Sequence, residues 1–105
     1  MKLPIDYISI LGTEWKVEWK PMPDEKGTIG LMSSDIHTIT VDPTIPYKEQ
    51  YNVLCHEITH AILHTSGLAH LIKLNLEEAI CDVVGNAFGK ILREEEDEEE
   101  LHTSR

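Results

Sequence analysis

Two histidines and a glutamate stand at metal-binding spacing in the middle of this sequence. The segment Cys55–His60 reads C-H-E-I-T-H, which contains an H-E-x-x-H pattern. On an α-helix, residues four apart lie one turn apart on nearly the same face, so the imidazoles of His56 and His60 can reach one ion. Glu57 points to the side, where a carboxylate can act on zinc-activated water without binding the metal. The spacing predicts a zinc hydrolase site, although helices also carry such residues for packing or solubility.

The apolar residues around this motif predict the helix that positions it. The helix is expected from Pro46 to His64, with Gly67 as a left-handed cap after it. Its apolar side chains are spread nearly all the way round, which is typical of a central helix that is covered on most sides. Polar groups buried there without partners would cost on the order of 2 kcal/mol or more each. The pattern therefore favours histidines that are bound to metal or hydrogen-bonded.

A second helix, expected to begin at Asn75, carries a narrow stripe of acids and glycines. Glu78, Asp82, Gly85 and Gly89 share one face at helical spacing. Glycines weaken a helix, but without a side chain they let a neighbouring backbone approach closely, and this is the role expected of them here. If the two helices pack antiparallel across these glycines, Glu78 can supply a third zinc ligand and Asp82 can accept a ring N–H from a ligand histidine. The alternative for Glu78 is a capping box with Asn75.

Other histidines and tyrosines near the motif are weaker candidates. His64 continues the four-residue spacing but lies about 12 Å along the axis from His56, too far for the same ion, and is expected to be a helix-end residue. His70 is the rival third ligand. It could instead donate to a transition-state oxyanion, as could Tyr47 or Tyr51.

The first forty residues alternate between apolar and polar side chains and predict strands. Segments 5–11 and 14–20 form one expected hairpin, and segments 28–32 and 36–41 form a second. The expected fold class is α+β: a small antiparallel sheet of about four strands in two hairpins, followed by two packed helices. The 36–41 strand is expected to present an edge to an extended peptide beside the site.

Length and composition indicate one domain with an acidic end. The 105 residues are 41% hydrophobic and 27% charged, which is ordinary globular composition. Residues 1–93 are expected to form a single domain, and residues 94–105 a frayed or disordered acidic tail. Seven of the ten net negative charges fall in residues 94–100, which leaves about −3 for the rest.

The distribution of charge and apolar residues also limits the partners. Without a basic stripe, direct nucleic-acid binding has little electrostatic support. The sequence shows neither a signal peptide nor a run of about 20 apolar residues, so we expect a cytoplasmic protein with no membrane partner. Cys55 and Cys81 are expected to be buried, reduced thiols. The wide apolar arc of the second helix suggests a homo-oligomer.

The two motifs together resemble a known family. H-E-I-T-H followed by E-A-I-C-D-V-V-G is similar to the glutamate-ligand zinc peptidases, and within them to the ImmA/IrrE-type metallopeptidase domain common in phages and mobile elements. The family's strand motif corresponds to Ile39–Val41, and the resemblance covers roughly residues 27–92. Cys81 and Val84 stand where the family usually has Ala and Phe. We find no helix-turn-helix before the domain.

The resemblance implies a function and a set of roles. The fold would be a minimal zincin-like domain. His56, His60 and Glu78 would hold Zn²⁺, and Glu57 would be the catalytic acid/base of a metallopeptidase. The substrate would be a protein or peptide, for example a regulatory protein, and the chain would cleave it as an endopeptidase. If the chain is phage-encoded, the reaction would take place in the host cytoplasm. Two alternatives stay open: a non-catalytic zinc-binding interaction module, and a zinc hydrolase acting on a non-peptide substrate.

Overall fold

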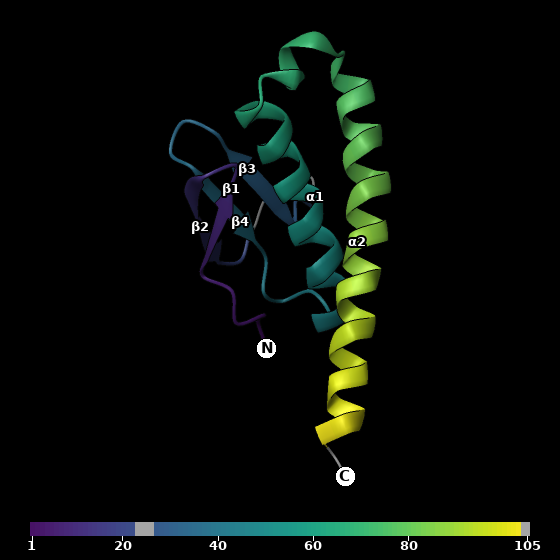
Figure 1. The fold of residues 1–105 in the computed structure, drawn as a ribbon. Coiled ribbons are helices and arrows are strands. Elements are labelled where there is room, and N and C mark those ends of the chain that lie inside the picture. The colour runs from purple at the N-terminus through teal and green to yellow at the C-terminus, as the bar shows by residue number, and fades with distance from the viewer. Residues whose placement is uncertain (23–26, 104–105) are drawn as a thin grey trace.

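The chain builds a four-stranded sheet and then two long helices (Figure 1). The computed structural model describes residues 1–22 and 27–103, with side chains described up to residue 96. The elements are β1 (Tyr7–Ile10), β2 (Thr13–Trp19), β3 (Gly30–Ser33), β4 (Thr38–Val41), α1 (Tyr47–Thr65), a short 3₁₀ helix η1 (Leu68–Leu71) and α2 (Leu74–Thr103).

The sheet is mixed, so the prediction of a purely antiparallel sheet was wrong. Both expected hairpins form, β1 with β2 and β3 with β4, but they join through a parallel pair in the order β1-β2-β4-β3. All four residues of β4 are buried, whereas Leu31 of β3 is about half exposed. Burial therefore favours β4 at the centre and β3 at the edge, and the long connection after β2 lets β3 reach that edge.

This order also corrects which strand is free beside the helices. The expected edge, residues 36–41, contains β4, whose two sides are already paired with β2 and β3. On this side of the sheet the edge strand is β3, and β1 forms the opposite edge. Any extended peptide that adds to this side of the sheet would therefore pair with β3.

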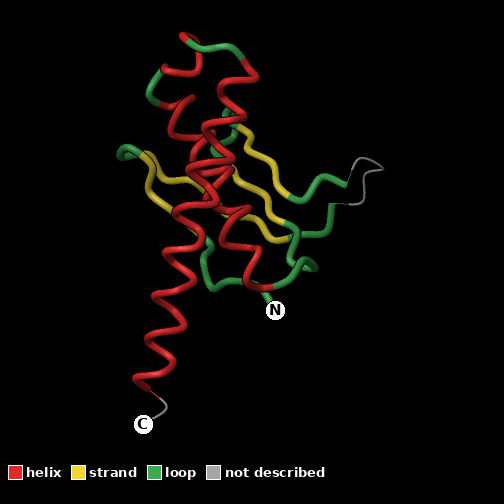
Figure 2. The backbone as a smooth tube through the Cα atoms, turned by 90° about the vertical axis from the view of Figure 1, so that its right-hand side faces the viewer, coloured by secondary structure: helices red, strands yellow, loops and turns green. Residues whose placement is uncertain are grey.

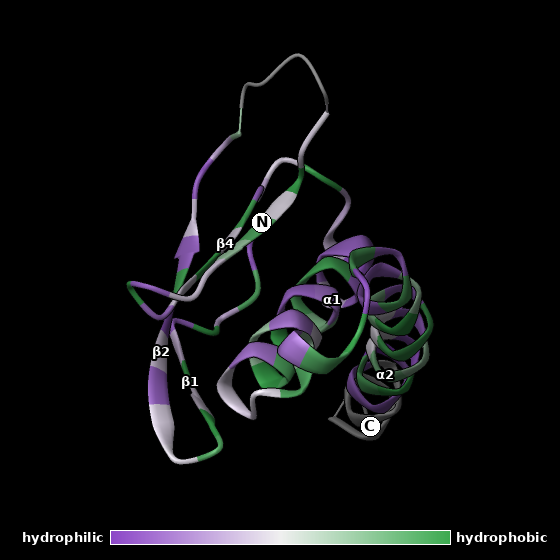
Figure 3. Cartoon of the chain, turned by 90° about the horizontal axis from the view of Figure 1, so that it is seen from above, coloured by the Kyte–Doolittle hydropathy of each residue, from purple (hydrophilic) through white to green (hydrophobic). Residues whose placement is uncertain are grey.

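Helix α1 lies between the sheet and α2, as the view from above shows (Figure 3). One face of α1 packs on the sheet through a core of buried apolar residues, and the turned view places both helices on the same side of the strands (Figure 2). The core consists of Leu3, Ile10, Trp15, Val17, Ile39, Val41, Leu54 and Ala61. The prediction of a central helix is thus confirmed, and this position places the H-E-x-x-H segment between the sheet and α2.

The two helices run antiparallel and touch backbone to backbone at the glycine stripe. A Cβ built on Gly85 would lie 2.9 Å from the His56 Cα, and one built on Gly89 would lie 2.8 Å from the Asn52 Cα. Real Cβ atoms essentially never come so close to backbone. The prediction that these glycines permit close approach is confirmed, and the approach brings the acids of α2 to the histidines of α1.

Gly89→Ala is expected to destabilise the fold by about 1–3 kcal/mol, because the added methyl group forces the two backbones apart. This figure is the net change. It already includes the opposing gain of about 1 kcal/mol that arises because alanine favours a helix more than glycine does. Urea unfolding of the metal-free protein measures the change. Lys90→Ala, an exposed neighbour on the same helix, is the matched control and should stay within about 0.5 kcal/mol of wild type. A Gly89→Ala protein as stable as wild type would contradict the close packing.

The outer side of α2 leaves apolar side chains uncovered. Val83, Phe88 and Ile91 are each at least half exposed, and self-association through this face stays a prediction.

The helical backbone continues through residues 94–103, where the sequence suggested a frayed or disordered tail; residues 104 and 105 lie outside the described part. Tyr47 donates a hydrogen bond to Glu96 at 2.9 Å, which ties this extension to α1. Within the described chain, no helix is both long enough and apolar enough to cross a membrane.

Candidate metal centre

His56, His60 and Glu78 come together at the contact between α1 and α2. The two rings lie 4.9 Å apart between centroids. The Glu78 carboxylate reaches both, with Oε2 at 3.6 Å from His56 Nε2 and Oε1 at 3.1 Å from His60 Nε2. Two ligands of a tetrahedral zinc ion with bonds of about 2.0–2.2 Å stand roughly 3.3–3.6 Å apart, so this set is close to the required spacing. The cluster could hold a metal ion.

The second nitrogen of each ring is held by a different acid of α2. His56 Nδ1 lies 3.1 Å from Asp82 Oδ1, and His60 Nδ1 lies 2.5 Å from Glu77 Oε2. An Nδ1–H that donates to a carboxylate leaves the lone pair of the ring on Nε2. Both Nε2 atoms therefore face the same space with lone pairs suited to a metal.

Glu78 does not act as a helix cap here. Helix α2 begins at Leu74, one residue before the expected cap, and Asn75 Oδ1 accepts a hydrogen bond from the Leu76 N–H instead. The Glu78 side chain, half exposed, extends to the histidine rings. Glu78 therefore lies where the shared face with Asp82 and the glycines predicts it, and not where a capping box would place it.

Glu57 lies beside this cluster in a nearly buried position. Its Oε2 is 4.0 Å from His56 Nε2, and the residue is 8% exposed. Burial raises the pKa of Glu57 to about 7; the nearby His60 opposes this rise, and the negative Glu78 adds to it. A carboxyl group with a pKa near neutrality can both accept and return a proton, which suits general acid–base work.

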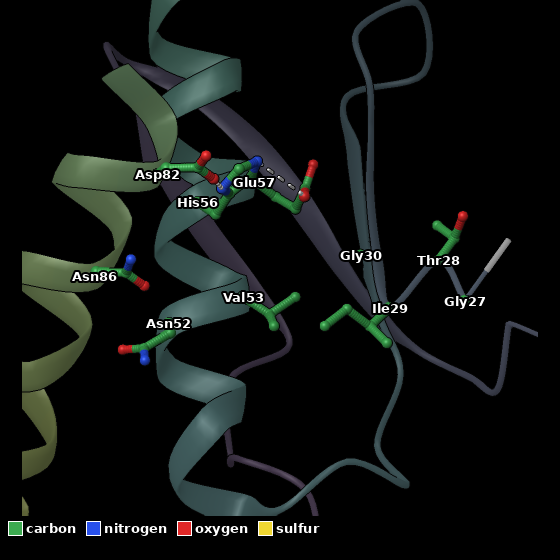
Figure 4. A pocket seen from close by; sticks show the side chains of 10 residues that line it. All are labelled: Gly27, Thr28, Ile29, Gly30, Asn52, Val53, His56, Glu57, Asp82 and Asn86. Carbon is green, nitrogen blue, oxygen red and sulfur yellow. Dashed lines mark ion pairs between the residues drawn. The ribbon is translucent and has the colours of Figure 1, made fainter. Parts of the chain in front are cut away.

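A cleft opens over α1 next to Glu57. Two adjoining cavities, of about 350 and 340 Å³, share Gly30, His56 and Glu57 in their linings. Figure 4 shows the first, with side chains of α1 as its floor, α2 on one side and the segment leading into β3 on the other. A Cβ on Gly30 would lie 3.0 Å from Glu57 Oε2, so a larger residue there would crowd the carboxylate.

The weaker candidates lie elsewhere. His70 is exposed and lines a different hollow, which it shares with Trp15, His37 and His64. Tyr51 packs edge-on against Tyr47 and against the hydrophobic core. None of the three is among the described residues that line the two cavities beside Glu57. The structure therefore brings neither His70 nor the tyrosines to the candidate centre.

Sequence reasoning missed Glu77 and its contact with His64. Glu77 Oε2 accepts from His60 Nδ1 and also lies 3.1 Å from His64 Nε2. Burial alone would raise the pKa of Glu77, but the hydrogen bonds from His60 and His64 outweigh it and hold the pKa below its usual value. Among the described residues, His64 is in no candidate metal group with His56, but it joins the centre through Glu77.

Cys81, which stands where the resembling family has Ala, is fully buried on α2. Burial, together with the surrounding acids, raises the pKa of its thiol to about 12. A thiol with this pKa remains protonated at neutral pH in the metal-free protein, so Cys81 packs there as a small apolar residue. Among the described residues it belongs to neither group that could hold a metal ion.

Comparisons of the chain with protein-family models, with curated proteins and with solved structures found no match.

Proposed function

We propose that this chain is a zinc-dependent metallopeptidase with a minimal zincin-like fold. The observation that carries the proposal is the convergence of His56, His60 and Glu78 on one point, with Glu57 directly beside it. Two imidazoles and a carboxylate are a ligand set that zinc accepts in hydrolases, and they leave one position open for chemistry. The resemblance of the two motifs to ImmA/IrrE-type peptidases supports the same assignment.

The residues of the chain have distinct roles in this proposal. Zinc bound by His56, His60 and Glu78 supplies Lewis acidity for hydrolysis at neutral pH. Glu57 takes the proton of the attacking water and then delivers it to the leaving amine. Asp82 orients the His56 ring through Nδ1. In the metal-free protein the pKa of Glu57 is near neutrality, and bound zinc would favour the ionised form that accepts the proton.

The cleft supports an extended peptide as substrate. The unpaired edge of β3 runs along the cavity that contains His56, Glu57 and Glu78, so main-chain groups of a peptide can pair with it. We propose that such a peptide is cleaved within its chain, as by an endopeptidase.

Metal analysis of purified variants tests the site before any substrate is known. Wild type is expected to bind one zinc per chain, His60→Ala and Glu78→Ala to lose stoichiometric zinc, and His70→Ala to keep it. Full zinc retention in Glu78→Ala, or loss in His70→Ala, would contradict the ligand assignment.

A panel of unstructured peptides and phosphoesters then tests the chemistry. Zinc-dependent cleavage of internal peptide bonds supports the proposal. Zinc binding without any cleavage would indicate an interaction module instead, and cleavage of phosphoesters alone would indicate a different class of hydrolase.

A further inference from the structure

Glu77 is the most buried acid next to the candidate metal centre, and the proposed reaction gives it no role yet. Its side chain is 6% exposed, whereas that of Asp82, which holds the other ligand histidine, is 67% exposed. Water competes with Asp82 for the His56 N–H but is largely kept from the contact between Glu77 and His60. The buried hydrogen bond should therefore constrain its ring more strongly than the exposed one.

A second metal ion is the obvious competing explanation, because His60, His64 and Glu77 also form a group that could hold one. The distances argue against it. His60 Nδ1 and Glu77 Oε2 are 2.5 Å apart, whereas two ligands of a tetrahedral zinc stand roughly 3.3–3.6 Å apart. So short a separation is that of a direct contact between the ring N–H and the carboxylate, with no room for an ion between the two atoms.

We propose that Glu77 is a positioning residue for His60 and that His64 holds the Glu77 carboxylate in place. The inference rests on the zinc site proposed above. Glu77 Oε2 accepts from His60 Nδ1 and from His64 Nε2, so one oxygen atom receives two donors from successive turns of α1. This fixes the tautomer of His60 with its proton on Nδ1, and it fixes the ring orientation, so that Nε2 points at the metal position.

The zinc affinity of three proteins tests the role. In competition with a chelator, Glu77→Gln is expected to bind zinc about 10- to 100-fold more weakly than wild type, at an unchanged maximum of one ion per chain. Asp82→Asn is the matched control, since it alters the equivalent contact of His56 at an exposed position, and its loss should be smaller. Wild-type affinity in Glu77→Gln would overturn the proposal. So would two zinc ions in wild type of which one disappears in Glu77→Gln.

The ring tautomer of His60 provides a readout that a purely structural role would not change. Long-range ¹H–¹⁵N spectra of metal-free wild type, at a pH where histidine is neutral, should show the proton of His60 on Nδ1. A proton on Nε2 overturns the proposal even if Glu77→Gln fails to fold. Both measurements are independent of catalysis: absence of peptidase activity would refute the proposed function alone, and normal zinc binding by Glu77→Gln would refute the positioning role alone.

Discussion

Glu57→Gln is expected to lower the turnover of the zinc-loaded protein by about 10²- to 10⁴-fold, because the amide can neither accept nor return a proton. The side chain keeps its size and its place beside Gly30, so the cleft should keep its shape. Zinc should stay bound at one equivalent, since Glu57 is not among the three candidate ligands. Steady-state kinetics on a cleaved peptide, with metal analysis of the same sample, measures both results.

The control for this experiment is Glu49→Gln, which removes an exposed acid from the first turn of the same helix. It should leave both turnover and zinc content unchanged. Undiminished turnover in Glu57→Gln would remove Glu57 from the mechanism. Loss of zinc together with activity would show instead that Glu57 belongs to the ligand set.

Much of the candidate centre could be predicted from the sequence because helical periodicity fixes which residues share a face. The four-residue spacing of His56 and His60 and the stripe that begins with Glu78 and Asp82 needed only the geometry of a helix. The glycines at 85 and 89 added the tertiary information, since they mark where a second backbone can approach. Two helices and one contact between them were enough to bring three candidate ligands together.

The order of the strands could not be predicted in the same way. Alternation identifies a strand and its buried face but does not choose its neighbours. The pairing of β2 with β4 depends on burying all of Thr38–Val41 between two strands, a property of the assembled sheet. The expected edge was therefore misplaced, although both hairpins were recognised from their local pattern.

Glu77 was missed for a different reason: the register of the two helices was not followed far enough. In antiparallel helices, moving back along one helix means moving forward along the other. Gly85 of α2 contacts His56 of α1. The residue eight positions before Gly85 is Glu77, and the residue eight positions after His56 is His64, so these two residues should face each other. The observed hydrogen bond between these two residues follows that register. The glycine contact thus contained the signal, while Glu77 was interpreted only as part of a helix start.

Metal-free protein is expected to lose about 3 kcal/mol of stability from Glu57 alone as the pH rises from about 4 to 9. In the folded state burial raises the pKa of Glu57 to about 7, against an ordinary value of 4.5 that applies in the unfolded chain. Between these values the folded state binds more protons than the unfolded state. The stabilising contribution is therefore fully present below pH 4.5 and is lost as the pH rises through 7.

Comparison with Glu57→Gln isolates this contribution, because glutamine does not ionise and all other titrating groups are shared. The free energy of unfolding, from urea denaturation in the presence of a chelator, should favour Glu57→Gln over wild type increasingly from pH 5 to pH 8.5. Adding zinc should shrink the difference at high pH, since a nearby cation favours the ionised carboxylate. A difference between the two proteins that does not change with pH would show that Glu57 ionises in the folded protein as easily as in water. It would then lack the buried, near-neutral character on which its acid–base role depends.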